Sequence, residues 1–155
     1  MPERTVEFLR KKDLRFIDEL GRGACGKTVL LHDNFIDEYF VCKKFMPTDE
    51  GQKNQLFQNF LREIKILHKL HHKNIVRIFH YYIYPEHCAG YILMEHVRGV
   101  DIENFLKQHP DMAADIFYQV VQGFSYLENH NILHRDIRPT NIIVSSNDTA
   151  KIIDF

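Results

Sequence analysis

The fold depends on the stretch GRGACGKT at residues 21–28, because this stretch fits two phosphate-binding patterns that belong to different architectures. Read as G-x-x-x-x-G-K-[ST], it ends in Lys27 and Thr28 and has to join a strand to a helix. Read as G-x-G-x-x-G, it lies either at the start of a helix or at the tip of a β-hairpin. The glycines of the two patterns are Gly21, Gly23 and Gly26. The residues that follow the glycines therefore decide the architecture.

The residues after Gly26 favour a strand. They read KTVLLH at residues 27–32, a β-branched and aliphatic run without helical spacing. A helical pattern begins only at Lys53. Both patterns that need a helix directly after the loop are therefore disfavoured, and we predict that the glycine-rich stretch is the turn of an antiparallel hairpin.

The spacing of apolar residues predicts an α+β fold, with about five antiparallel strands and one helix followed by a mostly helical part. The strand-like segments of the first part are residues 14–20, 28–31, 39–45, 75–84 and 91–97. Apolar residues recur every three or four positions over residues 53–70, which is typical of an amphipathic helix. In the second part we expect helices at residues 101–108 and 112–129 and a hairpin formed by residues 141–144 and 151–153.

Five motifs, in this order along the chain, resemble the signature of the eukaryotic-type protein kinases. They are GRGACG at residues 21–26, FVCK ending at Lys43, a helix that carries Glu63, HRDIRPTN at residues 134–141, and DF at residues 154–155. Each motif is weak by itself, but their joint order is specific and covers nearly the whole chain. The resemblance implies a kinase N-terminal lobe at residues 1–97, a hinge near residues 95–100 and the beginning of a C-terminal lobe at residues 98–155.

The resemblance also implies ATP as co-substrate and Mg²⁺ as cofactor for the transfer of a phosphoryl group to a protein hydroxyl. Lys43 would hold the α- and β-phosphates and would pair with Glu63. Asp136 would orient the substrate hydroxyl and accept its proton. Asn141 and Asp154 would be the magnesium ligands, since Mg²⁺ prefers oxygen donors.

Two lysines compete for the phosphate-binding role. Adjacent residues of a strand face opposite sides of the sheet, so only one of Lys43 and Lys44 can face the nucleotide. The family spacing from Thr28 favours Lys43. Glu63 lies beside the apolar stripe of a helix that must pack on the sheet, which brings it within reach of Lys43.

The adenine and ribose contacts follow from the resemblance alone. Met94 would be the gatekeeper, backbone groups of Glu95 and Val97 would bond the adenine edge, and Asp101 would contact the ribose. Ile143 would form the floor of the pocket. The roof and the phosphate loop would comprise Leu20, Gly21, Gly23, Gly26, Thr28 and Val41.

One catalytic-loop position departs from the serine/threonine kinase pattern. Arg138 stands where those enzymes typically have lysine, which keeps a positive charge near the γ-phosphate but replaces a point charge with a planar fork. We therefore include Arg138 among the catalytic candidates. The tyrosine-kinase form of the loop is absent, so the sequence favours serine or threonine as the acceptor.

The sequence stops at Phe155, before the glycine of the D-F-G motif, so we expect a fragment or a truncated kinase. Two other functions remain open. The first is a catalytically incompetent, pseudokinase-like module that binds nucleotide or protein. The second, less favoured, is a P-loop NTPase in which Lys27 rather than Lys43 holds the phosphates.

Composition sets the remaining expectations. The 155 residues carry a formal net charge of −1, which gives no general attraction to nucleic acid or to anionic membranes. No apolar run is long enough to span a membrane. The odd number of cysteines, three, favours a reducing compartment, and we expect a cytoplasmic protein. The expected partners are ATP and a protein substrate, and the sequence leaves the oligomeric state open.

Overall fold

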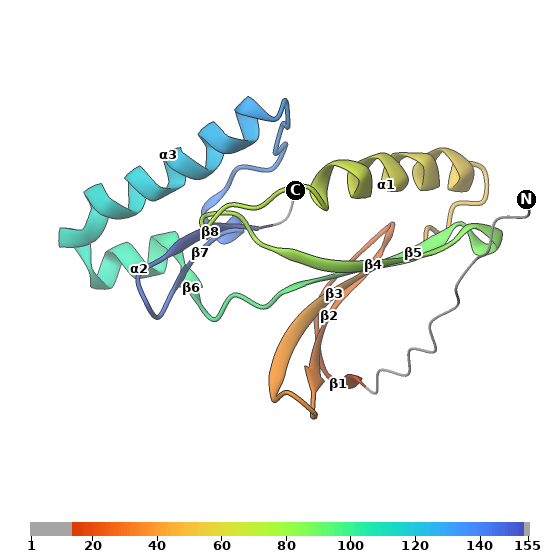
Figure 1. Ribbon diagram of the computed structural model, residues 1–155, viewed down its shortest axis with the longest axis horizontal. Helices are drawn as coiled ribbons and strands as arrows, with labels where there is room; N and C mark the ends of the chain where they lie inside the picture. The colour runs from red at the N-terminus through yellow and green to blue at the C-terminus, as the bar shows by residue number, and fades with distance from the viewer. Residues whose placement is uncertain (1–13, 154–155) are drawn as a thin grey trace, which may run out of the picture.

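The computed structural model describes residues 14–153, which form two antiparallel sheets and three α-helices (Figure 1). The first sheet has the strand order β1-β2-β3-β5-β4. Its strands are β1 (Leu14–Gly23), β2 (Gly26–Asp33), β3 (Glu38–Phe45), β4 (Ile78–Tyr84) and β5 (Ala89–Glu95). Helix α1 (Lys53–Leu67) lies against this sheet. The predicted α+β fold, with five antiparallel strands and one helix, is confirmed.

The second part is a small sheet covered by two helices. Its strands are β6 (Gly99–Asp101), β7 (Ile142–Ser145) and β8 (Ala150–Ile152), and its helices are α2 (Ile102–Gln108) and α3 (Ala113–Asn129). Three short 3₁₀ turns complete the described residues: η1 (Pro85–His87), η2 (Pro110–Met112) and η3 (Pro139–Asn141). The sequence did not predict β6, because three residues that begin with glycine show no alternation of apolar side chains.

Helix α1 packs on the sheet through one apolar face, as its spacing predicts. Phe57, Phe60 and Ile64 are buried and form a cluster with Ile92 of β5. Phe45 of β3 stacks on Phe60, with ring centroids 4.4 Å apart. The helix therefore has a fixed rotation about its axis, which determines where its polar side chains point.

Several element boundaries differ from the prediction, and at α1 and β4 the structure shows a separate cause for each difference. Helix α1 ends at Leu67 instead of residue 70, because the amides of Lys69 and Leu70 bond only three residues back. Strand β4 begins at Ile78 instead of residue 75, because Ile75 forms a parallel bridge with Ile152 of β8. The segment between α1 and β4 thus pairs with the small sheet.

A buried asparagine fixes this junction. Asn74 is fully buried, and its Nδ2 donates to Oε1 of Gln119 at 3.1 Å and to the carbonyl of Ala150 at 2.8 Å. Gln119 of α3 also accepts from the Ala150 amide and donates to the carbonyl of Asp148. These bonds hold the β7–β8 hairpin against α3 and against the chain that leads into β4.

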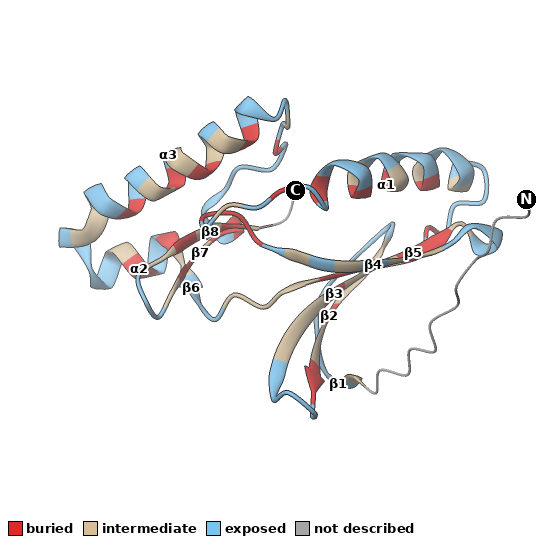
Figure 2. Cartoon of the chain, viewed as in Figure 1, coloured by how far each residue is buried: buried red, intermediate tan, exposed pale blue. Residues whose placement is uncertain are grey.

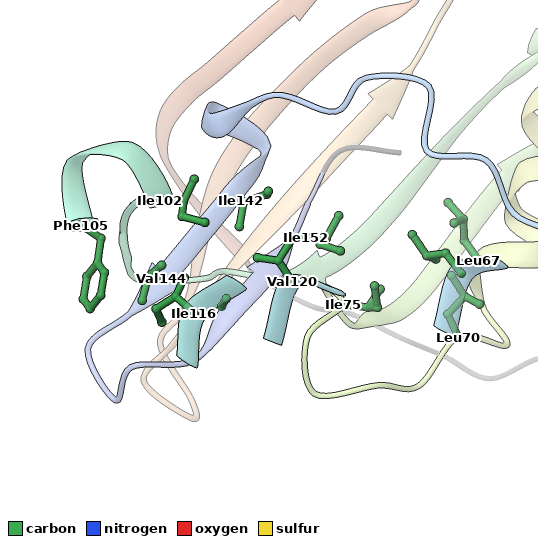
Figure 3. Close-up of a cluster of buried hydrophobic side chains, with 12 residues drawn as sticks. Leu67, Leu70, Ile75, Ile102, Phe105, Ile116, Val120, Ile142, Val144 and Ile152 are labelled. Atoms are coloured by element: carbon green, nitrogen blue, oxygen red, sulfur yellow. The ribbon is translucent and has the colours of Figure 1, made fainter. Parts of the chain in front are cut away.

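The core of the second part lies between α3, α2 and the small sheet (Figure 3). Gly123 of α3 permits this packing, since a Cβ there would lie 2.7 Å from Cδ1 of Ile152 and 3.1 Å from the carbonyl oxygen of Asn74. The opposite face of α3 is exposed (Figure 2), including Phe117 at 54% and Val121 at 62%. The predicted apolar stripe of this helix is therefore only partly buried, because the hairpin covers one side of it.

Candidate active site

The strand register places Lys43 on the same face of the sheet as α1. Lys43 pairs with Thr28 of β2 and with Ile92 of β5, and Ile92 packs on α1. The Nζ of Lys43 lies 3.9 Å from Oε1 of Glu63 on that helix. Lys44 faces the other side, with its Nζ 5.8 Å from the ring centroid of Tyr91. The alternation used to choose between the two lysines thus holds in the structure.

Glu63 lies in a partly desolvated position between two cations. Burial raises the pKa of its carboxyl above the usual range, while the charges of Lys43 and Arg135 act in the opposite direction. Arg135 belongs to the loop after α3 and has a left-handed backbone, with φ of 72°. Arg135 and Glu63 line the same cavity, so the HRD loop and α1 approach one another there.

A buried histidine connects the loop that carries Asp136 to the residue that follows β8. His134 is 4% exposed, and its Nε2 lies 2.8 Å from the carbonyl oxygen of Ile153. The amide of Asp136 donates to Nδ1 of the same ring at 3.2 Å. With Nδ1 accepting, Nε2 must carry the hydrogen, so the network assigns the tautomer. The sequence reasoning quoted this histidine within the motif but gave it no role.

Asn141 connects the other end of the loop to Asp136. It is 3% exposed, and its Nδ2 donates to both the carbonyl oxygen and Oδ2 of Asp136, at 2.9 and 3.0 Å. The carbonyl oxygen of Asn141 accepts from the amide of Ile153. The side-chain nitrogen is therefore committed, which leaves Oδ1 as the atom that Asn141 can offer to a cation.

Arg138 turns back toward the Asp136 carboxylate, with its Nε 3.3 Å from Oδ2. Both side chains are more than half exposed, so this ion pair contributes little to stability. Its relevance is positional, because it keeps a guanidinium beside the carboxylate. Asp154, the second expected metal ligand, lies outside the described residues.

One cavity joins these groups. Its volume is about 780 Å³, and its lining includes Lys43 from β3, Glu63 from α1 and Asp136 from the loop after α3. The structure thus brings together a lysine, its carboxylate partner and a second, exposed carboxylate from elements far apart in the sequence. The side-chain oxygen of Asn141 is a hard donor of the kind that Mg²⁺ prefers.

The glycine-rich stretch forms the β1–β2 hairpin, with Gly21 opposite Thr28 and Gly23 opposite Gly26. Gly26 has φ of 142°, and a Cβ there would collide with the carbonyl oxygen of Lys44. For Gly21 and Gly23 no described atom lies within 4 Å of an added Cβ. Of the three glycines in this stretch, packing against the described residues requires only Gly26, and Gly21 and Gly23 leave open space beside the backbone.

A sequence model of the protein kinase domain matches residues 14–155. The chain belongs to the protein kinase family. Aurora kinase B of Drosophila melanogaster is 32% identical over 151 residues, which cover 93% of this chain and 45% of that protein. The Aurora kinase of Saccharomyces cerevisiae is 30% identical over 147 residues, covering 92% and 39%. A probable serine/threonine-protein kinase of Lactococcus lactis is 30% identical over 145 residues, covering 91% and 23%. The chain therefore spans less than half the length of these relatives.

Family membership also decides against the P-loop reading of residues 21–28. In this kinase chain the glycine-rich stretch leads into β2, not into a helix, and Lys27 pairs with Arg22 across the hairpin. Among the described residues, no helix is long and apolar enough to cross a membrane.

The residues expected around adenine lie on β3, on β5 and just beyond the end of β5. Val41 pairs with Met94, and Met94 packs partly on the α1 cluster. The amide of Glu95 donates to the carbonyl of Arg77 at 2.8 Å, so only the carbonyl group of Glu95 remains for an adenine edge. Val97 is half-buried beyond the strand.

Asp101 and Ile143, expected at the ribose and below the adenine, are register partners in β6 and β7. Asp101 also caps α2, since its carboxylate accepts from the amide and the side chain of Asn104 at 2.9 and 2.7 Å. The bond from the Asn104 amide holds the pKa of Asp101 below its usual range. Leu20 is 50% exposed next to a break in the β1 register.

Proposed function

We propose that this protein kinase chain binds ATP with Mg²⁺ and contributes the catalytic groups that transfer the γ-phosphoryl group to a serine or threonine hydroxyl of a protein. The observation that supports the proposal is the single cavity lined by Lys43, Glu63 and Asp136. A cation and an exposed carboxylate in one cavity are groups that phosphoryl transfer needs, because catalysis of this reaction is positioning plus electrostatic stabilisation.

Each residue has a distinct part in this proposal. Lys43 neutralises the α- and β-phosphates, and Glu63 restrains the lysine side chain. Asp136 accepts a hydrogen bond from the acceptor hydroxyl and takes its proton as the hydroxyl oxygen attacks. Arg138, beside Asp136, offers positive charge to the γ-phosphate. Asn141 and Asp154 would hold Mg²⁺, which would supply positive charge to neutralise the phosphates.

We propose a hinge near residues 95–100, with residues 1–97 as the N-terminal lobe and 98–155 as the start of the C-terminal lobe. The described elements support this division, since β5 of the large sheet ends at Glu95 and β6 of the small sheet begins at Gly99. Adenine would lie beside this connection, between Val41 above and Ile143 below.

The test compares three lysine and aspartate variants. Lys43→Met should weaken Mg-ATP binding, whereas Lys44→Met, on the opposite face of the same strand, should leave it unchanged. Asp136→Asn should retain ATP binding but lower phosphoryl transfer about 10²–10⁴-fold, the usual contribution of a general base. Binding is measured by titration calorimetry, and transfer with a serine peptide and its tyrosine counterpart. Undiminished transfer in both Lys43→Met and Asp136→Asn would refute the proposal.

The same measurements address the non-catalytic alternative. A pseudokinase-like module would bind Mg-ATP and show no transfer in the unmodified chain, so turnover by that chain excludes it. Preferential phosphorylation of the tyrosine peptide would contradict the serine/threonine assignment and leave the kinase assignment intact.

A further inference from the structure

A recess next to the end of β5 carries more positive than negative charge. It has a volume of about 330 Å³ and is formed by the chain after α1, the start of β4, the end of β5 and β8. Its charged lining side chains are Lys73, Arg77, Lys151 and Glu95. Three cations and one carboxylate leave two positive charges in excess, although the whole chain has a net charge of −1.

The one carboxylate of the recess, that of Glu95, already has two partners. Oε2 of Glu95 lies 2.9 Å from Nζ of Lys151 and also accepts the Arg77 amide at 3.1 Å. Within residues 14–153, neither Lys73 nor the guanidinium of Arg77 forms an ion pair. The guanidinium carbon of Arg77 lies 5.3 Å from the ring centroid of Phe79, a cation–π contact that orients the planar fork.

A neutral histidine adds a donor to this wall. Nδ1 of His72 accepts the amide of Asn74 at 3.1 Å, which leaves Nε2–H as the donor of the ring. Burial lowers the pKa of His72, and the charges of Lys73 and Lys151 lower it further. Lys73, Lys151 and His72 all line this recess, so both positive charges and the ring donor face the same space.

We propose that this recess binds a phosphate monoester. Such a group carries about −1.5 to −2 charges at pH 7, which matches the two positive charges in excess. The fork of Arg77 can donate two parallel hydrogen bonds to phosphate oxygens. Leu70, Ile75 and Phe79 line the remaining wall and suit the carbon portion of the ligand. The ligand is a phosphorylated side chain or a small organic phosphate.

The site is separate from the cavity shared by Lys43 and Asp136 and does not depend on the function proposed for that cavity. Its test therefore uses the Lys43→Met background, which removes the phosphate lysine of the ATP site. Titration calorimetry measures the binding of three probes: a short phosphoserine peptide, the same peptide without phosphate, and phenyl phosphate.

We expect the phosphoserine peptide or phenyl phosphate to bind, and Lys73→Gln/Arg77→Gln to weaken that binding about tenfold or more, as expected for lost bonds to a charged group. Lys65→Gln/Lys107→Gln removes two exposed lysines elsewhere and should change affinity less than about twofold. Arg77→Lys keeps the charge but loses the fork and should give an intermediate affinity. Binding of phenyl phosphate without the peptide assigns the site to small organic phosphates, and binding of both assigns it to phosphorylated side chains.

Three results would overturn the proposal: no binding of either phosphorylated probe, measurable and equal binding of the peptides with and without phosphate, or equal loss of affinity in the two double variants. Lys73 and Arg77 are exposed, and thermal melts followed by circular dichroism check that their variants fold. If the double variant unfolds, Lys73→Gln and Arg77→Gln singly should each weaken binding by about three- to fivefold.

Discussion

Lys151 and Glu95 are 56 positions apart in the sequence, yet Nζ of the lysine lies 2.9 Å from Oε2 of the glutamate. Their side chains are only 18% and 26% exposed. Glu95 ends β5 of the large sheet, and Lys151 belongs to β8 of the small sheet. The pair therefore ties the two sheets together beside the three-residue connection between β5 and β6.

Replacing this lysine should destabilise the chain. Lys151→Met leaves the Glu95 carboxylate largely buried without its counter-charge, and we expect a loss of about 1–3 kcal/mol in the free energy of unfolding. Lys107→Met is the control, because Lys107 pairs with Glu103 in an exposed position and should change stability by less than about 0.5 kcal/mol. Urea denaturation measures both, and equal losses would contradict the expectation.

Substitutions at two glycines of the β1–β2 hairpin should have different effects, one on stability and the other on nucleotide binding. Gly26→Ala forces a side chain against the carbonyl of Lys44 at a positive φ, so we expect a loss of stability of about 1–3 kcal/mol or more. Gly21→Ala meets no described atom and should leave stability within about 0.5 kcal/mol. If Gly21 approaches the phosphates of ATP, the same alanine should raise the Kd for Mg-ATP about tenfold, or 1.4 kcal/mol. Unchanged Kd would exclude that approach.

The pKa of Glu63 predicts a specific dependence of stability on pH. Its folded pKa is raised from the usual 4.5, so the folded chain binds more protons than the unfolded chain in the interval above that value. Stability contributed by this residue is therefore greatest at low pH and is lost as the pH rises through the raised pKa. Relative to Glu63→Gln, the unmodified chain should become less stable from about pH 4.5 upward.

Urea denaturation of both proteins between pH 4 and pH 7 measures this difference. Lys43→Ala removes a charge that opposes the shift, so in that background the loss should extend to higher pH. A stability difference that is constant across the range would show that Glu63 is not desolvated in solution.

Asn141 should matter for stability as well as for any metal binding. Asn141→Ala removes both hydrogen bonds to Asp136 from a buried position, and we expect a loss of about 1–3 kcal/mol. Asn129→Ala, at the exposed end of α3, should change stability by less than about 0.5 kcal/mol. Thermal or urea unfolding distinguishes them. If Asn141→Ala leaves the free energy of unfolding unchanged, the bonds to His134 are sufficient to hold the loop.

Periodicity and turn chemistry predicted most of the fold, because these signals are local. The apolar spacing of residues 53–70 identified α1, and the strand-like run after Gly26 identified the hairpin. The errors lie where distant residues intervene. The pairing of Ile75 with Ile152 redirects the start of β4, and no pattern within residues 75–84 could reveal a partner so far along the chain.

The candidate site divides in the same way. Strand alternation predicted that Lys43 and Lys44 face opposite sides of the sheet, and the family spacing from Thr28 favoured Lys43, which the structure places on the side of α1. The ion pair between Lys151 and Glu95 could not be predicted from the sequence, because a lysine on a short strand is usually exposed to solvent. The capping of α2 by Asp101 could have been found, since an aspartate directly before a helical run is a standard N-cap signal.

Gly123 affects the site from the far side of the small sheet. Ile152 lies against the bare backbone of α3 at this position, and its neighbour Ile153 supplies the carbonyl oxygen that holds His134. A methyl group at position 123 would force the Ile152 side chain to move and would crowd the carbonyl oxygen of Asn74. The packing beneath the loop that carries Asp136 therefore depends on the absence of a side chain at position 123.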